Sequence, residues 1–206
     1  MNTQTLMVVR AATIQPRLRN RQWTHTTRLS TDGFCDKPAT LNLSHDLFMG
    51  MVNGQATISY RALAEMGLST RQAWDQAAHN LVQAATTPEG IRFDLRDGVT
   101  TTRISSPSLQ IRVPGAPMTA WLTHPRTFSL VNRHLELRLG PAPLYLAPTA
   151  DTLIALPAGS LYMGQFELWA RSFLKQSGKE GVVDKLLIYR HGFPAPYQPA
   201  HMALAA

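Results

Sequence analysis

The chain has 206 residues, of which 44% are hydrophobic and 16% charged, and its net charge is +7. This composition excludes a wholly disordered chain, and the length fits one domain or one domain with an appendage. The longest apolar runs hold about five residues, as at Leu153–Pro157, which excludes a membrane-spanning helix of roughly 20 apolar residues. The single cysteine, Cys35, excludes an internal disulfide and favours a reducing, cytoplasmic setting.

The positive charge is concentrated at the N-terminus. Residues 1–31 contain five arginines and no acidic residue, so they supply five of the seven net charges. Pro16 argues against one continuous helix in this stretch. We therefore predict a basic, extended N-terminal arm over residues 1–40.

Within that arm, Arg17, Arg19 and Arg21 alternate with other residues. In an extended segment they share one face, and Leu18 lies on the other. Arginines on one face can contact phosphates or other anions, and Trp23 can stack on a base. The alternative interpretation is a solvated tail without a ligand.

The folded body is predicted to start near Leu41 with a hairpin. Residues 41–47 alternate between apolar and polar side chains, the period of a half-buried strand. Asn53-Gly54 is a strong turn signal, and Ala56–Tyr60 resumes strand character.

Two helices follow. Ser59 can cap a short helix over Arg61–Met66, which Gly67 ends. Ser69 and Gln72 fit a capping box that opens a longer helix, and Pro88 bars its continuation. The apolar stripe of this second helix is Trp74, Ala77, Ala78, Leu81, Val82 and Ala85.

The middle of the chain predicts a second hairpin. Ile91–Leu95 and Val99–Ile104 are its strands, joined by a tight turn at Asp97-Gly98. Leu109–Val113 alternates as a further strand, and Met118–Leu122 is either another strand or the entry to a helix.

Two more helices are predicted in the second half. One opens at His124-Pro125 and ends at Gly140-Pro141, because proline suits a first turn and glycine an end. The other begins near Met163 and ends at Gly178. Their apolar stripes, interpreted as core packing, are Phe128, Val131 and Leu135 in the first helix and Phe166, Trp169, Ala170 and Phe173 in the second.

Strands at Leu144–Ala147, Thr152–Leu156 and Val183–Tyr189 complete the pattern. Strands cluster and helices are interspersed, without strict βαβ alternation. The fold class is therefore predicted as α+β, a mainly antiparallel sheet with three or four helices packed largely on one face. The domain covers residues 41–191, and residues 192–206 form a Pro- and Ala-rich tail.

The stretch 58–68, followed by a helix ending in Ala77–Leu81, resembles the YtpQ-like family of bacterial proteins of unknown function. The strand pair Leu146–Ile154, the helix at Met163 and the strand Lys185–Tyr189 occur in matching order. The resemblance covers about 75 residues and rests on packing and turn motifs. It implies an α+β fold, and it implies no activity and no catalytic residues.

Few residues have a spacing suited to chemistry. Asp75 and His79 lie four apart on a helix, so a carboxylate can meet an imidazole there, most simply as a surface pair. His45 and Asp46 are strand neighbours whose side chains point to opposite faces. Cys35 stands beside a carboxylate, which opposes a reactive thiolate. No histidines lie four apart and no second cysteine joins them, so we predict no metal and no cofactor.

Three functions remain open. The first is a non-catalytic domain that binds a protein partner or regulates one, with self-association through a strand at Val99–Ile104 as one form of it. The second is a nucleic-acid-associated protein that uses the arm. The third is a hydrolase assembled from distant residues such as His45, Asp151 and a Ser or Thr. The sequence favours the first.

Overall fold

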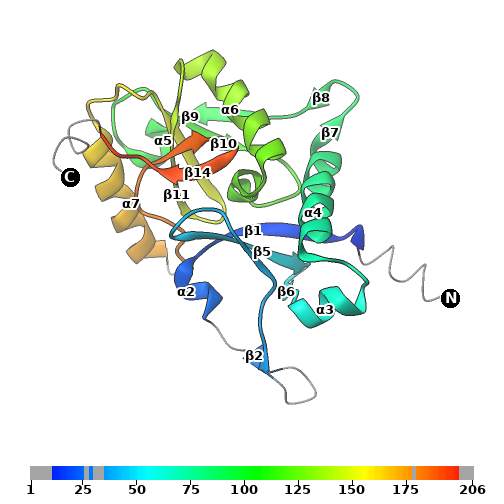
Figure 1. Cartoon of the computed structure of the whole chain (residues 1–206). Coiled ribbons are helices and arrows are strands. Elements are labelled where there is room, and N and C mark those ends of the chain that lie inside the picture. Colours follow the sequence, from blue (N-terminus) through cyan, green and yellow to red (C-terminus); the bar gives the residue numbers. More distant parts are fainter. Residues whose placement is uncertain (1–10, 26–27, 30–34, 178–179, 200–206) are drawn as a thin grey trace.

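The computed structural model describes residues 11–25, 28–29, 35–177 and 180–199, which form two antiparallel sheets and three long helices (Figure 1). The predicted α+β class with mainly antiparallel strands is confirmed. The long helices are α4 (Thr70–Ala85), α6 (Pro125–Leu139) and α7 (Met163–Ser177). Shorter helical segments are α2 (Arg21–Thr24), α3 (Tyr60–Glu65), α5 (Val99–Thr102) and the 3-10 helix η1 (Met118–Thr123).

The larger sheet has six strands in the order β14-β13-β11-β12-β10-β9, and every neighbouring pair is antiparallel. A short ribbon, β7 with β8, follows α4. The strands are β7 (Thr86–Thr87), β8 (Gly90–Ile91), β9 (Asp94–Asp97), β10 (Leu109–Arg112), β11 (Leu144–Thr149), β12 (Thr152–Leu156), β13 (Leu187–Arg190) and β14 (Phe193–Pro196).

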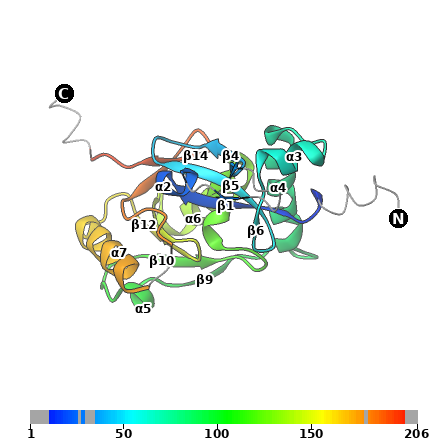
Figure 2. The same cartoon turned by 90° about the horizontal axis from the view of Figure 1, so that it is seen from below.

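The central strand β11 is buried on both faces. Because strand side chains alternate, Tyr145 and Ala147 enter the main core with residues of α4, α6 and η1. Leu144 and Leu146 enter a second core with Phe166 of α7. The predicted arrangement of helices largely on one face therefore holds for α4 and α6, whereas α7 covers the opposite face (Figures 1 and 2).

The smaller sheet contains a strand from the predicted arm. β1 pairs with β5 over seven residues, so the folded body starts before residue 41 and the predicted boundary at residue 40 is wrong. Ile14 and Leu18 lie on the inner face of β1 and are fully buried, which explains why this stretch joins the core. The strands are β1 (Ile14–Asn20), β4 (Thr40–Asn42), β5 (Leu47–Asn53) and β6 (Ala56–Thr57), with a separate ribbon of β2 (Arg28–Leu29) and β3 (Cys35–Asp36).

The predicted helix caps and the first turn are confirmed. The Ser59 hydroxyl accepts from the Ala62 backbone and opens α3. Ser69 and Gln72 form a reciprocal capping box at the start of α4. The turn after Asn53 joins β5 to β6, although the first strand of the predicted hairpin divides into β4 and β5.

The second predicted hairpin is wrong in its second strand. Val99–Thr102 forms the helical turn α5, and β9 pairs with β10 instead. The Asp97 carboxylate accepts a hydrogen bond from the Val99 backbone, which starts a helical turn rather than a two-residue hairpin. Self-association through a strand at Val99–Ile104 is excluded with it.

The predicted tail boundary at residue 192 is also wrong, because β14 completes the larger sheet. Its hairpin with β13 turns at His191 and Gly192, both with positive φ. Two positive φ values are those of the tight turn that suits paired strands. Phe193 stacks on Trp74 of α4, with ring centroids 6.3 Å apart.

Candidate functional site

Arg17 and Arg19 lie on the outer face of β1, as the alternation predicts, whereas Arg21 begins α2 and is exposed. Arg19 is already paired, since its Nη1 lies 2.6 Å from Glu180 Oε2 and its side chain is only 16% exposed. Burial and the charge of Arg19 lower the pKa of Arg17, and the nearby Asp151 opposes this shift.

Trp23 is 4% exposed, so its ring does not present a face on which a base could stack. The indole lies over Gly50 of β5, where an added Cβ would come within 2.6 Å of the ring. The Arg19 guanidinium covers the ring at 5.0 Å from its centroid. The predicted contact group of Arg17, Arg19, Arg21 and Trp23 is thus largely engaged within the domain.

His124 is the most tightly held histidine among the described residues. Its Nε2 lies 3.1 Å from Asp75 Oδ1, and its Nδ1 accepts a hydrogen bond from the Arg126 backbone at the start of α6. The second contact assigns the proton to Nε2, so neither nitrogen remains to act as a general base. The pair is structural, and it joins α4 to α6.

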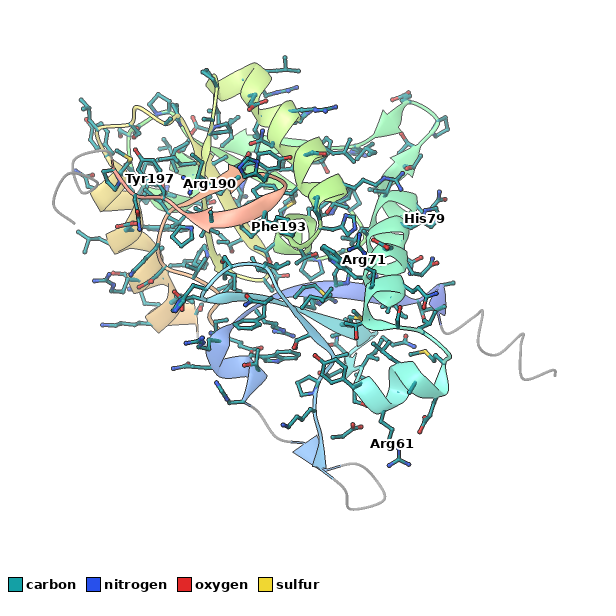
Figure 3. The ribbon with its side chains drawn as sticks, viewed as in Figure 1. Arg61, Arg71, His79, Arg190, Phe193 and Tyr197 are labelled. Carbon is teal, nitrogen blue, oxygen red and sulfur yellow. The ribbon has the colours of Figure 1, made fainter. Side chains whose placement is uncertain are left out.

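Asp75 therefore pairs with His124 and not with its predicted partner His79, which points away from the body of the molecule (Figure 3). His45 pairs with Asp46 at 2.8 Å in an exposed segment. Neither His45 nor His124 lines any of the four described cavities. Asp151 lines a cavity that His45 does not, so none of these cavities brings together the two residues named in the hydrolase hypothesis. The described residues contain no group of three metal-ligating side chains.

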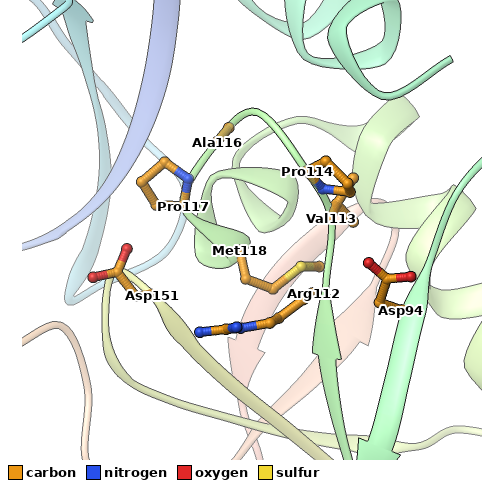
Figure 4. A pocket seen from close by; sticks show the side chains of 8 residues that line it. All are labelled: Asp94, Arg112, Val113, Pro114, Ala116, Pro117, Met118 and Asp151. Carbon is orange, nitrogen blue, oxygen red and sulfur yellow. The ribbon is translucent and has the colours of Figure 1, made fainter.

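One cavity of about 480 Å³ opens between the end of β10, the loop before η1 and the β11–β12 turn (Figure 4). Its apolar surface includes the buried side chains of Val113 and Met118. Three charged side chains complete the lining, namely Asp94 of β9, Arg112 of β10 and Asp151 of the β11–β12 turn. We call this the β10–η1 cavity.

The second feature is an apolar surface on α7 and on the turn just before it. Leu161 is 96%, Leu168 62% and Tyr162 40% exposed. Trp169 and Phe173, predicted as core, are only partly buried, and their rings stack with centroids 5.0 Å apart. We call these five residues the α7 face, and α7 forms an edge of the molecule in both ribbon views (Figures 1 and 2).

The α7 face was not predicted, because the helical period marks an apolar stripe without telling which part of it a sheet covers. Phe166 and Ala170 occupy the covered part. Leu161 and Leu168 lie outside the main apolar stripe of the sequence. This excess of apolar residues was the signal from which the α7 face could have been predicted.

No protein-family model matches the chain, and neither a curated protein nor a solved structure matches it. The resemblance to the YtpQ-like family stays a prediction. Among the described residues, no helix has both the length and the apolar character needed to cross a membrane.

Proposed function

We propose that this protein is a non-catalytic domain that binds a protein partner through the α7 face. The observation that carries the proposal is the clustering of exposed apolar side chains there, above all Leu161 and Leu168. Single exposed leucines are common on protein surfaces, but clusters on one element characterise interaction sites.

The geometry of the helix supports this proposal. Leu161 lies in the turn just before α7, and Leu168 follows it by seven residues. Tyr162 and Trp169 are also seven residues apart, and Phe173 follows Trp169 by four. These five apolar side chains lie along α7 and the turn that precedes it, where a partner can contact them. Burying a leucine contributes about 1.5–3 kcal/mol, so the two leucines together can carry a large part of a specific interaction.

The other hypotheses have weaker support. Nucleic-acid binding would use Arg19, which already contacts Glu180 and Trp23. For the hydrolase hypothesis, His45 does not line the cavity that Asp151 lines. We further propose a cytoplasmic location, on the ground of the single cysteine. The YtpQ-like resemblance is compatible with the proposal and lends no activity.

The test compares three forms of the full chain as bait in the cells that produce it. Replacing both Leu161 and Leu168 by Gln should reduce recovery of the partner about tenfold or more, because the apolar burial is lost. Leu137→Gln is the matched control, since Leu137 is 84% exposed but lies on α6. Quantitative mass spectrometry measures the recovery.

Circular dichroism should show equal folding of all three forms, because the replaced side chains are exposed. Sedimentation velocity distinguishes a second copy of the chain from a different protein as the partner. The proposal is refuted if the wild type and the double variant recover the same amount of partner and sediment with the same mass.

A further inference from the structure

The β10–η1 cavity is separate from the α7 face and has the features of a small-molecule site. Val113 and Met118 supply a buried apolar surface, and Pro114, Ala116 and Pro117 extend it (Figure 4). A cavity of about 480 Å³ falls within the range that accommodates small organic ligands.

Arg112 is the distinctive polar group in this cavity. Its register partner across the strands is Asp94, but the Asp94 carboxylate accepts a hydrogen bond from Arg92 Nε at 2.8 Å. The Arg112 guanidinium makes no hydrogen bond or ion pair with any described residue, and it extends toward the side of the cavity that holds Asp151 (Figure 4). Five N–H donors therefore remain for a ligand.

The surrounding charges limit what that ligand can be. Asp94 has Arg92 as its cationic neighbour, and Asp151 acts on the charge of Arg17. No described carboxylate contacts the Arg112 guanidinium, so its positive charge is left for a ligand.

We propose that the β10–η1 cavity binds a compact organic monocarboxylate with an apolar body. The carboxylate accepts two parallel hydrogen bonds from the Arg112 guanidinium, whose planar fork matches its geometry. The apolar body packs against Pro114, Ala116 and Pro117 and replaces water there. One negative charge matches the one guanidinium of the lining, since the two carboxylates have Arg92 and Arg17 as cationic neighbours.

The test uses benzoate as the probe, with benzamide as its neutral analogue of nearly the same shape. In a two-dimensional amide NMR titration of the full chain, benzoate should shift the signals of residues 112, 113, 115, 116 and 118 with a Kd of about 1 mM. Benzamide and inorganic phosphate should bind about tenfold more weakly, because benzamide lacks the negative charge and phosphate lacks an apolar body to pack against the lining.

Two variants locate the site. Arg112→Gln should weaken benzoate about tenfold, to the level of benzamide. Arg133→Gln, an equally exposed arginine on α6, should leave benzoate binding unchanged. The proposal is overturned if benzoate causes no saturable shift, if benzamide or phosphate binds as tightly, or if Arg112→Gln binds like the wild type. The amide spectrum itself shows whether each variant is folded.

Discussion

His134 lies on α6 with its ring 4.5 Å from that of Phe93, and its Nε2 atom is buried without a hydrogen-bond partner among the described residues. Burial, and then the charge of Arg138 on the same helix, lower the pKa of His134. Glu89 and Arg92, from the segment around β8, line the same cavity and are the other charged groups that face it. The folded protein therefore favours the neutral imidazole.

This preference predicts a dependence of stability on pH. The ordinary pKa of 6.5 applies to the unfolded chain, which takes up the proton more readily than the folded chain does. The contribution of His134 to stability is complete above pH 6.5. It is lost as the pH falls from 6.5 toward the lower pKa of the folded state. His134→Gln should reduce the loss of unfolding free energy between about pH 7.5 and pH 5, measured by urea denaturation.

The matched control for this prediction is His79→Gln, because His79 is exposed on α4. It should leave the pH dependence of the wild type unchanged. An unchanged pH dependence in His134→Gln would show that the buried imidazole does not control acid stability.

At the scale of the element, the β13–β14 hairpin depends on one glycine. Gly192 has φ +90, and a Cβ at this position would lie 2.6 Å from Cβ of Pro125, at the start of α6. Gly192→Ala should therefore lower the free energy of unfolding by about 2 kcal/mol, from backbone strain and from the clash. Chemical denaturation measures the change.

Gly159→Ala is the control for Gly192→Ala, because Gly159 has no positive φ and no atom within 4 Å of the added Cβ. It should change stability by much less. Equal stability of both variants would mean that the β13–β14 turn can relax without cost.

β14 also shows why an edge strand can be missed in a sequence. Pro194 and Pro196 make the segment look like a tail, yet the register places both at positions whose backbone nitrogen points away from β13. Proline costs no hydrogen bond at such positions, and it prevents pairing with a further strand.

Prediction from the sequence succeeded where local chemistry decides the structure. The Ser69–Gln72 capping box, the Pro125 helix start and the Asn53 turn need only neighbouring residues. It failed at Val99–Thr102, where the Asp97 carboxylate accepts from the Val99 backbone and starts a helical turn, because an Asp-Gly pair alone does not distinguish this turn from a hairpin.

The candidate sites were less predictable than the fold. His124 contacts Asp75 across 49 residues, and Arg112 lines the same cavity as Asp151 because β10, β12 and η1 come together. Spacing along one sequence does not contain such contacts. The alternation of Arg17 and Arg19 was predicted correctly, but the contacts of Arg19 with Glu180 and Trp23 were not.

At the scale of the whole molecule, the two sheets share one core, and β1 connects them. The Asn20 side chain donates to the Gly181 carbonyl at 2.7 Å, next to the pair of Arg19 with Glu180. These contacts attach the smaller sheet to the segment that follows α7. Arg19 of the predicted arm thus helps to hold the domain together. The exposed apolar side chains of the α7 face remain the strongest feature for recognition.

Site-specific photo-crosslinking in the cells that produce the protein is the most direct test of whether the α7 face contacts a partner. A photoreactive benzoylphenylalanine is placed at position 168 on α7 and, as the control, at position 137 on α6. We expect a discrete crosslinked adduct of higher mass from position 168 and none from position 137. No adduct from position 168, or the same adducts from both positions, would contradict the proposal that the α7 face binds a protein partner.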